Sequence, residues 1–244
     1  MRTRLAAWRR ISDRMDEPEL LESGCGSLDD VRANLSEMSR FNLRFGGLAA
    51  LRGFLFPKLL EGEAPLRLLD VGCGSASLSR EVVDWSRRCG RHVRIVGLDL
   101  DRRALAVARE RLRDYPEIEL VAGDALSPAF SAKSFDYAYS TLVLHHLSPA
   151  KIACLCETLS EICRHECVLS DLARDRLLLT LFNWTAPLLA RHPFTRHDGR
   201  VSILRAYTPK EMRTLLADAG FTHAKVRRHD WTCRMTVLLE PAKA

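Results

Sequence analysis

The spacing of apolar residues divides the chain into two parts. From the first residue to about residue 62, apolar positions recur at three- and four-residue intervals, which predicts helices interrupted by a glycine-containing turn at residues 23–26. From residue 66 the pattern changes to short apolar runs, which predict strands: LRLLDV, VRIVGLDL, IELVAGD, FDYAYSTLVL and ECVLSDL. A helical N-terminal part is therefore expected before a strand-rich region.

Helix-patterned segments separate the predicted strands. They are SLSREVVDWSRR, RRALAVARERLRD and PAKIACLCETLSEICR. Strands that alternate with helices at this spacing form βαβ units, so we expect an α/β fold with a mostly parallel sheet and helices on both faces. Near the C-terminus, FTHAKVRRHD and WTCRMTVLLEP predict a hairpin at the sheet edge.

Residues 174–206 break this alternation. The segment is apolar and aromatic in RLLLTLFNWTAPLLA and polar in RHPFTRHDGRVS, which indicates an insertion that ends in a polar loop. The next helix is predicted to begin at Thr208-Pro209, because Thr208 and Glu211 have the spacing of a capping box, and to end at Gly220.

The composition limits the classes of function. The net charge is +6, but the arginines are spread over many predicted helix faces, which favours a solvated surface over a nucleic-acid-binding face. Eight cysteines behind an N-terminus, MRTRLAAWRR, that lacks an apolar secretion signal predict reduced thiols in the cytoplasm. No apolar run reaches the roughly 18 residues of a membrane span. The spacing of Cys154, Cys156, Cys163 and Cys167 does not match structural zinc sites, so no metal site is expected.

The segment LRLLDVGCGSASLSR places a buried strand directly before a glycine-rich turn and a helix. Gly72 and Gly74 allow a tight turn and a close approach to a ligand, and the start of the helix offers free N–H groups. Asp99 and Asp124 follow the next two strands, where one carboxylate can bond ribose hydroxyls and the other an adenine amine. These positions predict a nucleotide-like ligand at the carboxyl edge of the sheet.

The order of these residues resembles that of the class I methyltransferases that use S-adenosylmethionine (SAM), over about residues 40 to 240. Asp70-x-Gly72-x-Gly74, Asp99, Gly123-Asp124-Ala125 and FDYAYSTLVLHHL correspond to their first four motifs. Ala76 stands where many members carry a third glycine, a change we expect to be tolerated. The resemblance implies SAM as the cofactor and a Rossmann-like, mostly parallel seven-stranded sheet with an antiparallel edge hairpin. It also implies cofactor contacts at Asp70, Gly72, Cys73, Gly74, Asp99, Leu100, Gly123, Asp124, Ala125 and Ser140.

Within that superfamily the chain looks most like the ubiquinone/menaquinone-biosynthesis-like group and its relatives that act on aromatic or polyketide-like metabolites. This likeness lies in Arg40-Phe41-Asn42 with Gly46-Gly47, Ser170-Asp171-Leu172-x-Arg174, and Arg196-His197-Asp198-Gly199 with Ser202 and Arg205. It implies a helical lid at residues 1–62 and a SAM-binding domain at residues 63–244, with the insertion on the substrate side. It further implies methyl transfer to a small aromatic, polyketide-like or quinone-like acceptor, with oxygen as the expected atom.

Three histidines are candidates for a general base. His145 and His146 follow the fourth strand, where a neutral imidazole can take a proton from a phenol, a hydroxyl or an acidic carbon, although the pair also fits ordinary packing at a helix start. His197 and Asp198 can form a base with its orienting carboxylate, or belong to a polar loop. Phe182 and Trp184 fit either an acceptor pocket or plain core.

Two other functions share parts of this pattern. An oxidoreductase that uses nicotinamide adenine dinucleotide (NAD) would have the strand, the glycine turn and the ribose carboxylate, but Gly72-x-Gly74-x-x-Ser77 lacks the third glycine of that fingerprint. A non-catalytic SAM-binding relative is the other alternative. We expect no nucleic-acid partner, because no RNA-binding module accompanies the motifs. The sequence leaves a homodimer open.

Overall fold

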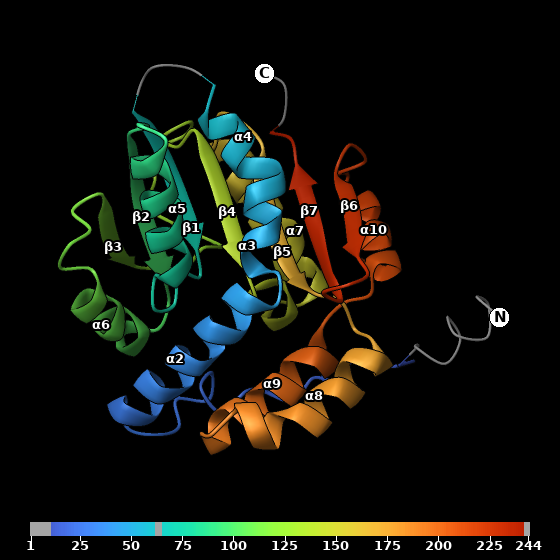
Figure 1. Ribbon diagram of the computed structural model, residues 1–244. Helices are drawn as coiled ribbons and strands as arrows, with labels where there is room; N and C mark the ends of the chain where they lie inside the picture. Colours follow the sequence, from blue (N-terminus) through green and yellow to red (C-terminus); the bar gives the residue numbers. More distant parts are fainter. Residues whose placement is uncertain (1–10, 62–64, 242–244) are drawn as a thin grey trace.

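The computed structural model describes residues 11–61 and 65–241. Its strands are β1 (Leu66–Val71), β2 (Val93–Asp99), β3 (Ile118–Ala122), β4 (Tyr137–Thr141), β5 (Cys167–Leu172), β6 (Lys225–His229) and β7 (Arg234–Leu239). They form one sheet in the order β3-β2-β1-β4-β5-β7-β6 (Figure 1). β1 to β5 are parallel, and β7 runs antiparallel to β5 and β6. The predicted α/β fold, with seven strands and an edge hairpin, is confirmed.

One face of the sheet is covered by α7 (Pro149–Ile162) and α10 (Pro209–Asp218). Leu69 and Val71 of β1 point to this face because successive strand residues alternate sides. The capping box that begins α10, with Thr208 and Glu211, forms as predicted.

The other face is covered by α5 (Ser77–Arg88) and by a helical run near the N-terminus. That run consists of α3 (Gly47–Ala50), the π-helical turn η1 (Leu51–Leu55) and α4 (Phe56–Leu59). Its apolar side chains belong to the same core cluster as Leu68 of β1. The predicted division into a lid at residues 1–62 and a domain at residues 63–244 stays a prediction, and part of that boundary lies outside the described residues.

Three helices lie beyond the carboxyl ends of the parallel strands (Figure 1). They are α2 (Leu28–Arg44), α8 (Arg176–Leu189) and α9 (Pro193–Arg205), and α2 also contacts α6 (Arg102–Arg111) beside β2 and β3. At this end the chain leaves β1 and β4 in opposite directions along the sheet. Open α/β sheets bind ligands at such a switch point.

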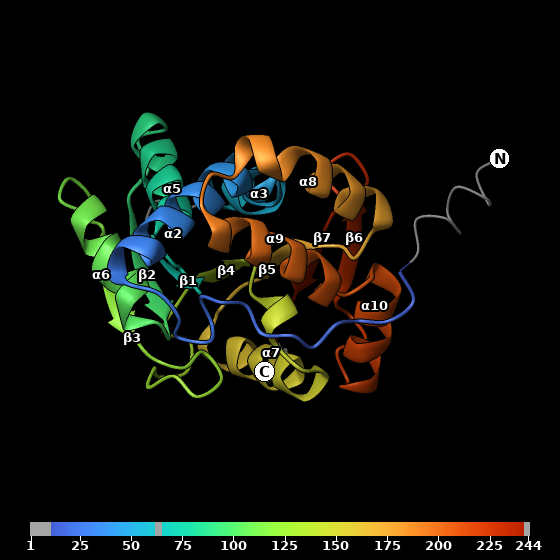
Figure 2. The same cartoon turned by 90° about the horizontal axis from the view of Figure 1, so that it is seen from below.

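Residues 11–27, which we call the strap, are extended and turned. The prediction of helix is therefore wrong over residues 11–22, whereas the turn predicted at residues 23–26 is present, and residues 1–10 lie outside the described residues. Gly24 and Gly26 have positive φ, and the backbone is held by distant partners: the Met15 N–H donates to the Leu204 carbonyl, and the Arg14 guanidinium donates to the His145 carbonyl. The strap crosses the ends of the strands beside α9 (Figure 2).

The polar half of the insertion is the helix α9, so the prediction of a polar loop is wrong. Pro193 occupies the first turn, where its missing N–H costs no hydrogen bond, and the His192 ring accepts a hydrogen bond from the Phe194 N–H. Packing against α8 and α2 stabilises α9, and a local pattern does not reveal such contacts.

No disulfide bond joins the eight cysteines, all of which lie within the described residues. Across residues 11–61 and 65–241, no helix is long and apolar enough to cross a membrane.

Candidate active site

The glycine-rich turn after β1 has the backbone that the sequence predicted. Gly72 has φ of +68°, and a Cβ there would lie 2.4 Å from Val143 Cγ2. Gly74 has φ of +53° and open space in front of it. A side chain is therefore excluded at the first glycine by contact and disfavoured at both by conformation, which leaves bare backbone facing the ligand region.

Asp99 is tied to this turn. One carboxylate oxygen accepts the Gly74 N–H at 2.7 Å, and the other accepts the Asp101 N–H at 2.8 Å. Burial raises the pKa of Asp99, although both hydrogen bonds oppose the rise. A carboxylate has about four acceptor positions, so these two backbone bonds leave two unused. Asp99 is not among the residues that line the cavity described below, and its contact with SAM stays a prediction.

Asp70 is buried at the end of β1 and accepts a hydrogen bond from the Ser79 hydroxyl at the start of α5. Burial raises its pKa to about 7, with a further contribution from the charge of Asp99. The carboxyl of Asp70 therefore binds the beginning of α5 to β1 and lines the cavity described next.

A cavity opens over the turn, closed by α2, the strap and α9. Two residues of its lining, Asn34 and Asn42, each have a buried amide oxygen without a hydrogen-bond partner, and the Asn42 oxygen lies against Gly47. Buried amide oxygens are costly unless a ligand or water bonds them, so the cavity fits a polar ligand such as SAM. The lining comprises Glu19, Leu21, Asn34, Leu35, Met38, Ser39, Asn42, Asp70, Gly72, Cys73, Gly74, Ser75, Ser77, Leu78, Thr141, Leu142, His145, His146, Asp198 and Ser202.

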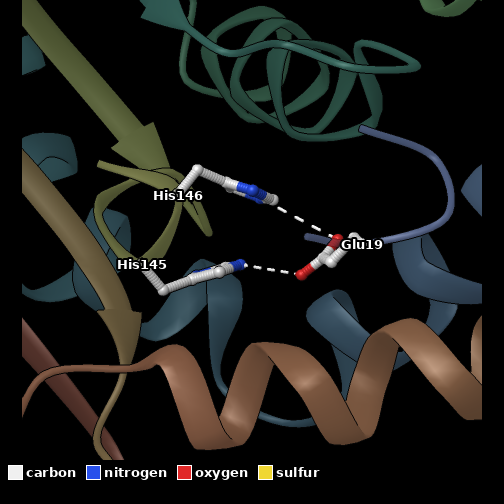
Figure 3. A group of neighbouring side chains, drawn as sticks. All are labelled: Glu19, His145 and His146. Atoms are coloured by element: carbon white, nitrogen blue, oxygen red, sulfur yellow. Dashed lines mark ion pairs between the residues drawn. The ribbon is translucent and has the colours of Figure 1, made fainter. Parts of the chain in front are cut away.

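His145 lies in η2 (Leu144–His146), just after β4, and is buried between two carboxylates. Its Nδ1 is 2.8 Å from Asp171 Oδ1, and its backbone N–H donates to Asp171 Oδ2. Its Nε2 is 3.3 Å from Glu19 Oε1 of the strap (Figure 3). Burial disfavours the charged imidazole, but Asp171 and Glu19 outweigh this effect and raise the pKa of His145 to about 10.

His146 stands beside His145, with ring centroids 4.1 Å apart. Its Nδ1 is 3.4 Å from Glu22 Oε2, and its Nε2 is 4.0 Å from Glu19 Oε2. Both imidazoles therefore direct the same ring nitrogen at one carboxylate, as Figure 3 shows.

His197 and Asp198 are in contact, but only Asp198 lines the cavity. The Asp198 carboxylate is buried at the cavity wall, where it accepts the backbone N–H groups of Leu20 and Leu21 and the amide of Asn34. His197 Nδ1 is 3.1 Å from Asp198, but its ring is about one-third exposed and not part of the lining. Asp198 thus anchors the strap, and the role of His197 as a base stays a prediction.

Of the remaining predicted cofactor residues, some line the cavity and others do not. Cys73 lines it, whereas Leu100 is 74% exposed and Asp124 is exposed, with its carboxylate accepting the Leu126 N–H. The Ser140 hydroxyl is buried and donates to the Val71 carbonyl. Their roles in binding SAM stay predictions.

Gly123 and Ala125 flank Asp124 beyond β3. The Gly123 N–H donates to the Asp99 carbonyl, and a Cβ at Gly123 would lie 3.1 Å from Leu98. Ala125 packs against the core. Both residues therefore shape the loop that carries Asp124.

The two aromatic candidates do not line the cavity. Trp184 is 79% exposed, and the Phe182 ring packs over Gly199, where an added Cβ would lie 2.3 Å from it.

Two residues of the site were not singled out as functional from the sequence. Asp171 ends a strand beside a candidate histidine, so its position at the carboxyl edge was a usable signal. Glu19 lies in an irregular segment 126 residues before His145 in the chain, and no local pattern marks it.

Part of the sequence that forms this site is similar to known methyltransferases. A family described as "Methyltransferase domain" matches residues 68–166. The 2-phytyl-1,4-naphtoquinone methyltransferase of Thermosynechococcus vestitus is 45% identical over 67 residues, 28% of this chain and 28% of the relative. The demethylmenaquinone methyltransferase of Staphylococcus haemolyticus is 37% identical over 75 residues, 29% of this chain and 28% of the relative. The chain matches less than a third of the length of these curated relatives.

Solved structures extend the likeness to the whole fold. Human N-acetylserotonin methyltransferase in complex with SAM has a TM-score of 0.62 at 16% identity, covering 92% of this chain and 62% of that one. A SAM-dependent methyltransferase from Aquifex aeolicus has a TM-score of 0.53 at 16% identity, covering 76% and 89%. Residues 68–166 therefore match a methyltransferase domain in sequence, and the chain has the fold of the class I SAM-dependent methyltransferases.

Proposed function

We propose that the chain transfers a methyl group from SAM to a hydroxyl of a small quinone-like or polyketide-like acceptor. The observation that carries this proposal is the buried pair of His145 and Asp171 at the wall of the cavity formed by the glycine-rich turn. The names of the matched relatives support a quinone-like acceptor.

The residues around the turn fit SAM. The bare backbone at Gly72 and Gly74 permits a close approach, and the Asp99 carboxylate is held ready for the ribose hydroxyls. When bound, SAM supplies a methyl group on a positively charged sulfur, so the protein contributes mainly orientation and exclusion of water.

The pair of His145 and Asp171 receives the proton of the acceptor hydroxyl in this proposal. Asp171 holds the Nδ1 side of the ring, which leaves Nε2 as the atom that takes the proton while the acceptor oxygen gains the methyl group. Base assistance of this kind typically contributes about 10²- to 10⁴-fold in rate.

Glu19 must leave His145 before this step. In this structure Glu19 lies over the cavity and faces His145 Nε2, an arrangement we call closed. The raised pKa of His145 means that the ring already carries a proton. Displacement of Glu19 by the acceptor removes one of the two charges that raise this pKa, so Nε2 releases its proton to solvent and then has a lone pair to accept the proton of the acceptor hydroxyl. The strap, α2, α8 and α9 thus act as the lid over the acceptor.

The first test is calorimetric titration of the purified protein with SAM and, separately, with NAD. We expect Kd in the micromolar range for SAM and no heat with NAD. A folded protein that binds NAD but not SAM would refute the proposal in favour of an oxidoreductase.

The second test identifies the product. The protein is incubated with methyl-labelled SAM and a panel of phenols, quinols and polyketide-like hydroxyketones, and labelled products are assigned by mass spectrometry and NMR. We expect the label on oxygen. Label on a ring carbon would keep the methyltransferase activity and correct the acceptor atom.

A further inference from the structure

Glu19, His145 and His146 form a compact group of potential metal ligands. One ligand atom from each, the two Nε2 atoms and a carboxylate oxygen, lie within 4.8 Å of one another (Figure 3). Ligands around a tetrahedral ion at about 2.0–2.1 Å are separated by roughly 3.4 Å. The distance between His145 Nε2 and Glu19 Oε1, 3.3 Å, already has this value, and His146 Nε2 lies 4.0 Å from the other oxygen of the same carboxylate, Oε2.

Each imidazole is also oriented from its other side. His145 Nδ1 bonds Asp171, and His146 Nδ1 faces Glu22, so both Nε2 atoms are directed at the same point. Histidines that ligate metals usually donate the second ring N–H to a carboxylate in this way, which fixes the ring and strengthens the ligand. A packing role for the pair of histidines would not require two such carboxylates.

The charges of the group favour a cation. Three carboxylates, of Glu19, Glu22 and Asp171, surround the two rings, and the guanidinium of Arg205 pairs with Glu22. Buried carboxylates are costly without compensating positive charge. A divalent ion placed between the rings and Glu19 supplies that charge in place of the proton on His145.

We propose that Glu19, His145 and His146 bind a divalent transition metal ion such as Zn²⁺ in the closed state of the strap. Two imidazoles and a carboxylate are ligands that suit Zn²⁺, with one coordination position left for water. The sequence predicted no metal site from the cysteine spacing, and this group consists of other residues.

The bound ion has a consequence that rests on the proposed function. It occupies the lone pair of His145 Nε2, so the same atom cannot take a proton from the acceptor. It also ties the strap to the loop after β4 through Glu19. Metal binding and methyl transfer therefore exclude each other at this atom.

The test starts with protein freed of metal by chelation and titrated with ZnCl₂ in a calorimeter. We expect one site per chain, with Kd in the micromolar range or tighter. His146→Ala and Glu19→Gln should each weaken binding at least 10-fold. His192→Ala is a matched control, because His192 also faces a carboxylate, Asp30, at 3.1 Å but lies outside the group; it should change Kd less than 2-fold.

The exposed thiols Cys25 and Cys89 are a competing source of zinc binding. All titrations are therefore repeated with both changed to serine, and Co²⁺ is used as a spectroscopic probe. Visible bands without a thiolate charge-transfer band support nitrogen and oxygen ligands. Zinc binding that disappears in the serine variant, or that is unchanged in both His146→Ala and Glu19→Gln, would overturn the metal site.

SAM binding and methylation are measured on the same samples, so the two proposals fail separately. Zinc binding at this group without any SAM binding would refute the proposed function and leave the metal site standing. SAM binding and turnover without a zinc site would refute the metal site and leave the proposed function standing. With both present, Zn²⁺ should inhibit turnover more than 10-fold in the wild type and less than 2-fold in His146→Ala.

Discussion

The two sides of the cavity differ in how their residues are distributed along the chain. On the cofactor side, Asp70 to Ser79 form one continuous strand, turn and helix, and Asp99 ends the next strand. On the acceptor side, contacts join positions far apart: Leu20 and Asp198 are separated by 178 residues, and His146 and Glu22 by 124. The first side is local structure and the second is tertiary structure, so their responses to substitution should differ.

The largest effect is expected at His145 on the acceptor side. His145→Gln should lower kcat by about 10²- to 10⁴-fold, because no other ring nitrogen takes the acceptor proton, while Kd for SAM changes less than about 3-fold. Steady-state rates and calorimetry measure the two quantities.

His197→Gln is the matched control for that substitution, since it removes the other histidine that contacts a buried aspartate. We expect a change in kcat of less than about 3-fold. Equal losses in the two variants would contradict the assignment of the base to His145. A loss below about 10-fold in His145→Gln would mean that orientation alone drives the reaction.

The next effect tests the cofactor side. Asp99→Ala removes the carboxylate that is held by two N–H groups, and Kd for SAM should rise about 10- to 100-fold, or roughly 1.4–2.7 kcal/mol. Asp124→Ala removes an exposed carboxylate and should raise Kd less, by about 3- to 10-fold. A larger loss at Asp124 would show that its loop closes onto the cofactor.

The difference between the local cofactor side and the tertiary acceptor side explains what could be predicted from the sequence. The sheet and the glycine turn follow from apolar period and from residues adjacent in the chain, so the fold and the positions of Gly72, Gly74 and Asp99 were predictable. The strap was not predictable, because Glu19 is placed by bonds to α9 that have no local signal. The helix α9 was missed for the same reason: it is stabilised by packing against α8 and α2, and its own sequence is polar.

A smaller effect concerns the stability of the cofactor side without ligand. Burial raises the pKa of Asp70 from 3.8 to about 7, so the folded protein keeps a proton there at pH values where the unfolded chain has lost it. The free energy of unfolding therefore falls as pH rises through this range, and the loss is complete above about pH 7. The free energy of unfolding of wild type should therefore fall by about 2–3 kcal/mol more than that of Asp70→Asn between pH 5 and pH 8.

Urea unfolding of both proteins at the two pH values measures this difference. Parallel pH dependence in wild type and variant would mean that Asp70 is ionised throughout, and that its bond with Ser79 compensates fully for burial.

The smallest effect is expected at Ala76, the position where a third glycine is common. Ala76 is fully buried with φ of +53°, a left-handed conformation that costs a non-glycine residue roughly 1–2 kcal/mol. Ala76→Gly relieves this strain, but it removes a buried methyl group worth about 0.8 kcal/mol and adds flexibility to the unfolded chain worth about 0.4–1 kcal/mol. The opposing effects nearly cancel, so stability and Kd for SAM should change by less than about 1 kcal/mol, measured by urea unfolding and calorimetry. A gain well above that value would show that the alanine keeps the turn strained, and that the cofactor side is less optimised than its local sequence pattern indicates.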